Sequence, residues 1–272
     1  AVTTLSDLYL QREDWTKALP LLEVLRESAA KSRRTQLEAE VLKQMGGCLR
    51  LIGRTDDALA YYRGAYDKGA DDGTVLRALG ELNLAAGSID VAATYFGRFI
   101  DGLSAAELAR EGNEVFSTMA SIQQALGNEE SAREWLEQAL DNAPEDASAI
   151  ASLIQVAEKQ NNFLRANDHR RRLATLQTDP LEQLATYIAI GDACRTYLLA
   201  PESAREAYEH AHTLVPDSKV PLLKLLELHA KAGNHEATAE TLKRVLVRET
   251  DAARKLSFAF ARASLLHREL GN

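Results

Sequence analysis

Hydrophobic residues recur three or four positions apart along most of the chain, which is the spacing of an amphipathic helix. The stretch 113–144 contains two such helices, and Gly127 with Asn128 separates them. Gly adopts the left-handed conformation that ends a helix, Asn caps the next helix, and Pro144 closes the stretch. The inward-facing residues of this helix pair are Phe116, Met119, Ala120, Ala132, Leu136 and Ala139.

Small residues near the start of each second helix recur at a regular spacing. Successive members of this series are 40, 34, 40, 34, 38 and 34 residues apart. The alternation predicts extra residues after every second pair, near 28–38, 101–112 and 175–183. We therefore predict seven helix pairs and one further helix over 256–270. The series is Ala18, Ala58, Ala92, Ala132, Ala166, Ala204 and Thr238.

The repeated unit resembles a tetratricopeptide repeat. In that family, helix A carries a large residue and an apolar–small pair, a Gly precedes the turn, helix B is lined by Ala, an aromatic residue or Leu, and Ala, and a Pro follows. Gln123 replaces the usual aromatic residue of helix A. The resemblance implies an all-α, right-handed superhelical solenoid of antiparallel helix pairs, and we expect one domain over 1–272. The matching residues are Phe116, Met119, Ala120, Gly127, Ala132, Leu136, Ala139 and Pro144.

Three positions depart from an ideal amphipathic repeat. Gly46 and Gly80 lie inside helix A, where Gly costs about 1 kcal/mol relative to Ala, so we expect close packing of another helix there. In the fifth repeat, Arg170 occupies the aromatic position of helix B. This substitution predicts either a weak point in the packing or a contact surface.

The two ends of the chain suggest a segment of a longer array. Gly271 and Asn272 stand where the second helix of an eighth pair is expected to begin, so Phe260, Leu265 and Leu266 lack a partner helix in this reading. The alternative is that the last helix serves as a C-terminal cap. A start without Met is compatible with removal of the initiator Met, cleavage of a signal peptide, or excision from a longer protein.

Composition and charge narrow the range of partners. The chain is 46% hydrophobic but only 6% aromatic, which favours helix packing over a sheet core. Its 32 basic and 40 acidic residues give a net charge of −8, so nucleic acid is not an expected partner. No apolar run is long enough to span a membrane, and we expect a soluble chain in the cytoplasm or the periplasm. We expect Cys48 and Cys194 to be buried free thiols.

The residues that carry chemistry do not form a recognisable catalytic or metal-binding motif. The six histidines are scattered, no phosphate-binding loop or nucleophile motif is present, and carboxylate pairs occur at helix starts, where the helix dipole favours them. We expect no catalytic residues, no metal, no cofactor and no enzymatic activity. The sequence does not indicate which oligomeric state the protein adopts.

The resemblance implies that the A helices line a concave face that binds a peptide or a protein segment. A positive cluster of Lys43, Arg50 and Arg77 is the first candidate on this face, and an apolar groove around Leu223 and Phe258 is the second, with Ile188 and Leu265 nearby. The expected function is a non-enzymatic protein-interaction scaffold within a larger assembly. The alternative is a sensor arm that binds a signalling peptide or a small ligand to control an attached effector domain. The candidate partner-binding residues are Lys43, Arg50, Arg77, Glu81, Ser117, Ser121, Gln124, Gln155, Asp192, Arg195, Leu223 and Glu227.

Overall fold

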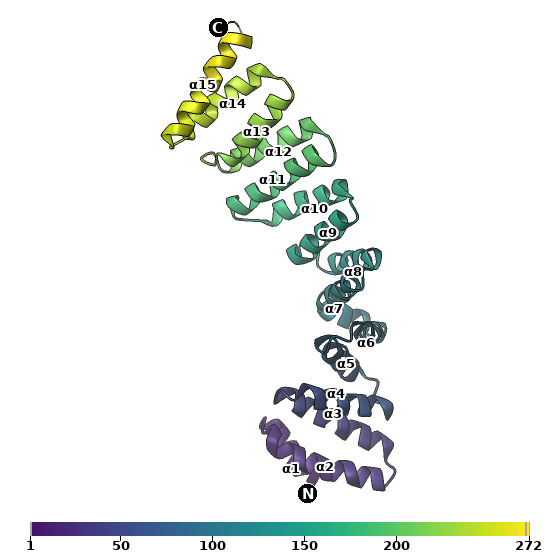
Figure 1. The fold of residues 1–272 in the computed structure, drawn as a ribbon. Helices are drawn as coiled ribbons and strands as arrows, with labels where there is room; N and C mark the ends of the chain where they lie inside the picture. The colour runs from purple at the N-terminus through teal and green to yellow at the C-terminus, as the bar shows by residue number, and fades with distance from the viewer. Residues whose placement is uncertain (1, 270, 272) are drawn as a thin grey trace. The chain divides into compact units, whose positions relative to one another are not determined.

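A computed structural model describes residues 2–269 and residue 271. Within these residues the chain forms fifteen α-helices and no strand, and inside each compact unit every helix packs against the next one along the chain. The chain divides into two compact units, Ala1–Asn142 (unit 1) and Ala143–Asn272 (unit 2). Figure 1 shows the helices of unit 2 stacked as successive antiparallel layers. The predicted all-α architecture of paired helices is confirmed.

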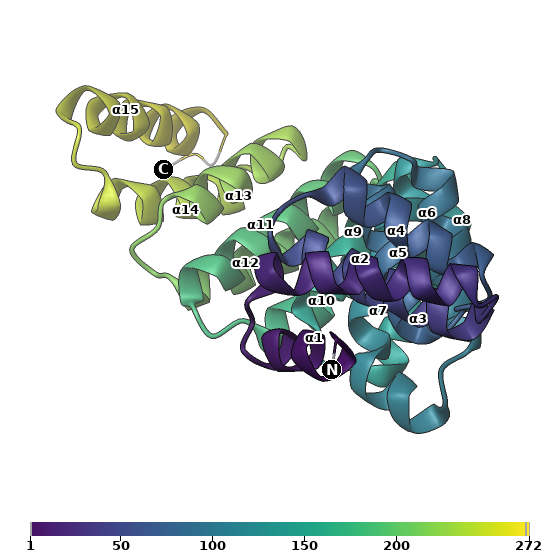
Figure 2. The same ribbon diagram turned by 90° about the horizontal axis from the view of Figure 1, so that it is seen from below.

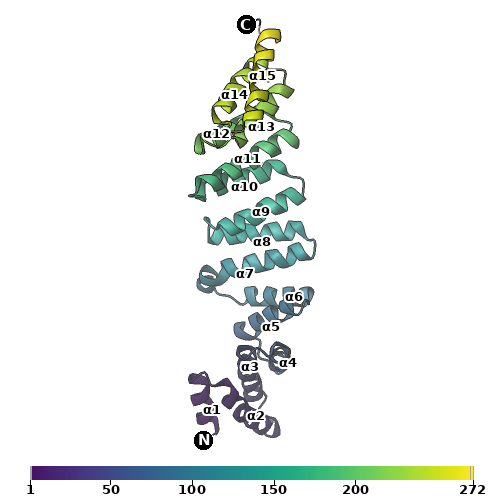
Figure 3. The same cartoon turned by 60° about the vertical axis from the view of Figure 1, so that its left-hand side comes forward.

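Unit 1 contains four helix pairs. In each pair the odd-numbered helix is helix A and the even-numbered helix is helix B, and α7 and α8 run side by side in opposite directions (Figure 3). The helices of unit 1 are α1 (Val2–Gln11), α2 (Trp15–Lys31), α3 (Thr35–Leu51), α4 (Thr55–Asp67), α5 (Gly73–Ala85), α6 (Ile89–Asp101), α7 (Ala105–Ala125) and α8 (Glu129–Asn142).

Unit 2 contains three further helix pairs and one last helix, as the repeat spacing predicts. The odd–even naming of A and B helices continues through it. The helices of unit 2 are α9 (Ala147–Lys159), α10 (Phe163–Leu176), α11 (Pro180–Thr196), α12 (Pro201–Leu214), α13 (Val220–Lys231), α14 (His235–Arg248) and α15 (Ala252–Glu269).

The small residues that open helix B are buried. All six alanines of this series are 0% exposed, and Thr238 is 8% exposed. A larger side chain at these positions would overpack the interior. The assignment of this series to the inward face of helix B is therefore confirmed.

Glycines inside helix A face a ring on helix B. A Cβ atom added to Gly46 would lie 2.8 Å from Cδ2 of Tyr62, and one added to Gly80 would lie 2.9 Å from Cε2 of Phe96. Both distances are too short for a real Cβ contact. The expected packing reason for these two glycines is confirmed, and the ring is the group that requires it.

The turn between helix A and helix B needs one residue in the left-handed conformation. Gly127 provides it with φ +78°, as the sequence predicts. Glu13 and Asn161 hold the same conformation at φ 57° and φ 55° in the first and fifth repeats. The turn geometry is therefore kept even in the repeats that lack the glycine.

The extra residues between repeats lengthen helices instead of forming loops. The predicted insertion at 101–112 lies mostly within α7, which has 21 residues, and those near 28–38 and 175–183 lengthen α2, α3 and α11 to 17 residues each. Ser104 and Glu107 form a capping box at the start of α7, so only residues 102–104 separate this long helix from α6.

The fifth repeat accommodates Arg170 through a buried polar network. Arg170 is 9% exposed; its guanidinium forms an ion pair with Glu158 of α9 and donates to Oδ1 of Asn167 at 2.9 Å. Asn167 is 1% exposed and donates to Sγ of Cys194 on α11 at 3.4 Å. The network joins α9, α10 and α11. The predicted contact surface at Arg170 is wrong because the side chain is buried, whereas the weak point in the packing stays a prediction.

The last helix packs on α14 and contributes no fully buried residue. Figure 2 shows α15 as the final layer of unit 2. Phe260 is 75% exposed, whereas Leu265 and Leu266 are half-buried. The helix starts at Ala252, earlier than predicted, and residues 270 and 272 of the predicted end lie outside the described residues.

Candidate partner-binding face

The candidate residues lie on A helices of both units. Those of unit 1 are on α3, α5 and α7, and those of unit 2 are on α9, α11 and α13. We use the name A-helix face for the side of each unit that these residues share.

Two of the candidate cations, Lys43 and Arg50, lie on α3 and are paired with carboxylates of the α5 region. Lys43 Nζ lies 2.7 Å from Glu40 Oε2 and 3.0 Å from Asp72 Oδ2, and Asp72 caps α5. Arg50 Nη2 lies 2.7 Å from Glu81 Oε2. Burial disfavours the charged form of Lys43, but the hydrogen bonds to both carboxylates outweigh burial and hold its pKa above the usual range. Both ion pairs connect α3 with α5.

Arg77 is held by three carboxylates. Its Nε lies 2.8 Å from Glu81 Oε1, its Nη2 lies 2.8 Å from Glu114 Oε1, and its Nη1 lies 3.5 Å from Glu111 Oε2. The hydrogen bond to Glu81, followed by that to Glu114, raises the pKa of Arg77 although burial opposes it. The contacts to Glu111 and Glu114 connect α5 with α7.

The predicted positive cluster is therefore wrong in its electrostatic character. Lys43, Arg50 and Arg77 come together on one face, as expected, but each of them is paired with an acidic residue. Glu81 is among the predicted binding residues, whereas the other partners were not predicted. A negative residue 29 to 37 positions after a positive one is the signal that could have revealed Asp72, Glu111 and Glu114, because that interval is close to the repeat length. The missed partners are Glu40, Asp72, Glu111 and Glu114.

Two cavities open beside these ion pairs in unit 1. The first, of about 430 Å³, lies between α5 and α7 with an apolar lining; we call it the α5–α7 groove. The second, of about 640 Å³, is lined by Lys43 and by several carboxylates near the start of α5 and α7. The α5–α7 groove is lined by Arg77, Glu81, Leu84, Ala85, Phe96, Glu114, Val115 and Thr118.

The uncharged candidates form no comparable network. Ser121 Oγ donates to the carbonyl of Ser117 at 3.0 Å, so this hydroxyl serves its own helix. Gln124 is half-buried on α7, and Gln155 is exposed on α9 of unit 2. These residues provide polar surface without fixed charge.

The charged candidates of unit 2 repeat the pattern of unit 1. Arg195 Nη1 lies 2.7 Å from Glu227 Oε1, and Lys224 Nζ lies 2.8 Å from both carboxylate oxygens of Asp192, so α11 and α13 are joined twice. Asp192 also accepts a hydrogen bond from the hydroxyl of Tyr208 at 2.7 Å. Burial and this hydrogen bond raise the pKa of Tyr208.

The apolar alternative site is partly filled. Phe258 and Ile188 pack against the buried core of unit 2, and Leu265 is half-buried. Leu223 is 42% exposed on α13. Of the residues proposed for that groove, Leu223 offers the most accessible surface.

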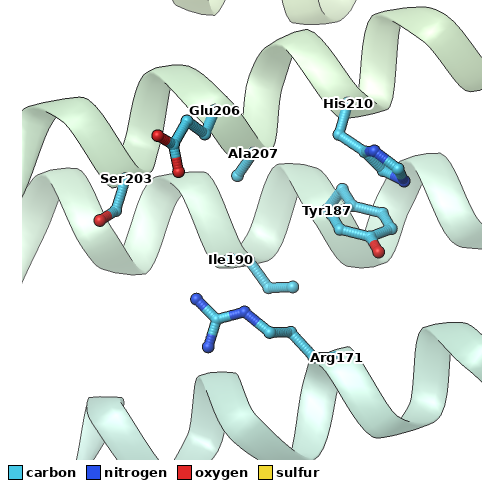
Figure 4. A pocket seen from close by; sticks show the side chains of 7 residues that line it. All are labelled: Arg171, Tyr187, Ile190, Ser203, Glu206, Ala207 and His210. Carbon is cyan, nitrogen blue, oxygen red and sulfur yellow. The ribbon is translucent and has the colours of Figure 1, made fainter.

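A further cavity of about 240 Å³ lies between α10, α11 and α12 in unit 2. Figure 4 shows Arg171 reaching in from α10 and Glu206 from α12, with Tyr187 and Ile190 on α11. The rings of Tyr187 and His210 lie 4.1 Å apart between centroids. Sequence reasoning missed this cavity, because its lining is contributed by three helices of two repeats.

The described residues give no geometric support for metal chemistry or for a membrane span. Within residues 2–269 and 271, no three His, Cys, Asp or Glu side chains are grouped so that they could hold a metal ion. Over the same residues, no helix combines the length and apolar character that crossing a bilayer requires. Cys48 and Cys194 are both 2% exposed free thiols, as expected, and burial raises the pKa of each.

The arrangement of consecutive antiparallel helix pairs defines the class of this protein as a tetratricopeptide-repeat-like helical solenoid. Solved structures with that fold are similar to it. The C-terminal part of a TPR repeat-containing protein from Cytophaga hutchinsonii matches with a TM-score of 0.53 and 13% identity, covering 94% of this chain and 98% of that one. YrrB, described as a TPR protein with an unusual peptide-binding site, matches with a TM-score of 0.51 and 16% identity, covering 76% and 97%.

A third similar structure is that of Naa15/Naa10 bound to HypK-THB. Its matched chain has a TM-score of 0.65 and 13% identity; the alignment covers 97% of this chain but only 38% of that longer one. No protein-family model and no curated protein sequence matches the chain. At these identities, the similarity concerns the fold.

Proposed function

We propose that the protein is a non-enzymatic scaffold that binds a segment of a partner protein on the A-helix face of unit 1. The observation that carries this proposal is the α5–α7 groove, because it places apolar surface from Leu84, Phe96 and Val115 beside charged side chains on the face where the predicted binding residues gather. Apolar pockets with a few polar groups at the rim are the usual form of a binding site.

The groove can be closed by one substitution at an exposed position. Ala85 lines the groove and is exposed, so Ala85→Trp fills the groove without disturbing the core. Ala60 on helix B α4 is also exposed and lies outside the groove, so Ala60→Trp adds the same side chain elsewhere.

The test is selection from a displayed library of random peptides against the unmodified protein. Selected peptides should bind the protein and the Ala60→Trp variant, and should lose binding to the Ala85→Trp variant. A library that yields no peptide sensitive to Ala85→Trp would refute the assignment of binding to this groove.

As an alternative function we propose a sensor arm that binds a small ligand in the cavity of Figure 4. Arg171 contacts Asp168 at 3.0 Å through Nη1 only, and Glu206 has no ion-pair partner among the described residues. A cation and an unpaired carboxylate beside a cavity of about 240 Å³ suit a small zwitterion, whose two charges match them.

This alternative is tested by thermal unfolding in the presence of free amino acids, with simple amines and simple carboxylates as comparison ligands. Amino acids should raise the unfolding temperature, Glu206→Gln should abolish the effect, and Glu202→Gln on the same helix should leave it unchanged. Equal effects of all three ligand classes, or no effect of Glu206→Gln, would exclude the cavity as a zwitterion site.

A further inference from the structure

At the rim of the α5–α7 groove, the cation Arg77 is already paired with carboxylates of the protein. Arg77 uses Nε, Nη1 and Nη2 on Glu81, Glu111 and Glu114, and the second oxygen of Glu81 contacts Arg50. An acidic ligand at Arg77 competes with these carboxylates and is repelled by them. The rim therefore resists the acidic partner that three nearby cations suggest.

The surroundings of the groove carry more carboxylates than cations. Glu114 is the most accessible of the three that contact Arg77, because its side chain is 71% exposed and its second oxygen has no ion-pair contact among the described residues. The neighbouring cavity adds further acidic lining residues. Across the groove, its ion pairs and this cavity, seven carboxylates face four cations: Glu40, Asp71, Asp72, Glu81, Glu107, Glu111 and Glu114 against Lys43, Arg50, Arg77 and Arg110.

We infer that the occupant of the α5–α7 groove is a basic protein segment that places an apolar side chain against Leu84, Phe96 and Val115 and a Lys or Arg side chain against Glu114. The inference rests on the proposed function, because it assigns the chemistry of the segment bound at the same site. The apolar lining supplies contact area, and the acidic surplus selects the sign of the ligand by electrostatic complementarity.

The composition of the selected peptides tests whether the bound segment is positively charged. Peptides that require the open groove, as shown by their loss on Ala85→Trp, should contain Lys or Arg within a few positions of an apolar residue. Their binding should weaken as salt is raised, because the carboxylates at the rim are exposed.

Charge removal at the rim provides the matched test. Glu114→Gln should weaken these peptides by about two- to fivefold, the value of an exposed ion pair. Glu134 is exposed on helix B α8 and outside the groove, so Glu134→Gln should leave binding unchanged.

The outcomes distinguish the basic character of the bound segment from the assignment of the groove as the binding site. Groove-dependent peptides that are rich in Asp and Glu, or that bind Glu114→Gln as tightly as the unmodified protein, would overturn the inference and leave the groove as the binding site. An absence of any groove-dependent peptide would instead refute the proposed function itself.

Discussion

Replacement of Gly191 by alanine tests the packing rule of this fold at its tightest point. Gly191 on α11 faces the ring of Tyr208 on α12, and an added Cβ overlaps Cε1 and lies 2.7 Å from Cδ1. Tyr208 is 0% exposed, and its hydroxyl donates to Asp192 at 2.7 Å. Lys224 holds Asp192 in turn at 2.8 Å. The ring is thus fixed at both ends and cannot move aside easily.

Two opposing effects set the size of the change. Overpacking a close-packed interior costs about 1 to 3 kcal/mol, whereas Gly→Ala inside a helix gains about 1 kcal/mol. Because the added Cβ overlaps a fixed ring, the upper part of the overpacking range applies, about 2 to 3 kcal/mol, and the net expectation for Gly191→Ala is a loss of about 1 to 2 kcal/mol in the free energy of unfolding. Gly97 in α6 has no neighbouring atom within 4 Å of an added Cβ, so Gly97→Ala should gain about 0.5 to 1 kcal/mol.

Urea unfolding followed by far-ultraviolet circular dichroism measures both variants. The sign of the shift in the unfolding midpoint should differ between Gly191→Ala and Gly97→Ala. The Gly191→Ala penalty should also shrink in a Tyr208→Phe background, because the ring then loses its hydrogen bond to Asp192 and can shift. Stabilisation by Gly191→Ala, or an equal penalty in both backgrounds, would refute the reasoning.

Three further changes test other parts of the fold. Ala132→Leu should lower the free energy of unfolding by about 1 to 3 kcal/mol because Ala132 is 0% exposed, while Glu130→Leu at the surface of the same helix should change it little; equal shifts in urea midpoint would contradict the assigned face. Arg170→Ala should cost about 1.5 to 3 kcal/mol in the same assay because it leaves Glu158 without its buried partner, and a neutral result would show that the network is not stabilising. Burial lowers the pKa of His212 from its ordinary 6.5, so the unfolded chain binds this proton more readily; stability is retained above that pH and lost below it. The thermal midpoint should therefore fall less between about pH 7 and pH 5 in His212→Gln, and an identical fall would exclude His212 as a contributor.

Helix pairing was predictable because it depends on local pattern. The small residue at the start of helix B and the apolar spacing of helix A both lie within one repeat, so a sequence of about 34 residues contains the information for one pair. The insertions were harder to place. At the insertion over 101–112, Ser104 and Glu107 cap the long helix α7. The repeat spacing shows that residues are added, but only the structure shows that they are helical.

The helices that carry the candidate residues were predictable, but the ion pairs that these residues form were not. The position follows from helix A of each repeat, whereas the charge depends on which side chains of neighbouring repeats meet. Arg50 meets Glu81 and Arg195 meets Glu227, 31 and 32 residues further along the chain. Such pairs depend on the rotation between successive repeats, and periodicity alone does not specify that rotation.

The surplus of acidic residues around Arg77 lets one surface hold the repeats together and also bind a basic ligand. A ligand cation that takes up Glu114 leaves Arg77 with Glu81 of its own helix and with Glu111 of α7, so the contact between α5 and α7 keeps one of its two carboxylates. An acidic ligand has no equivalent reserve, because it competes for Arg77 and releases a carboxylate that then faces the remaining negative charges. The network that joins the repeats therefore favours a basic partner over an acidic one, independently of the apolar contacts in the groove.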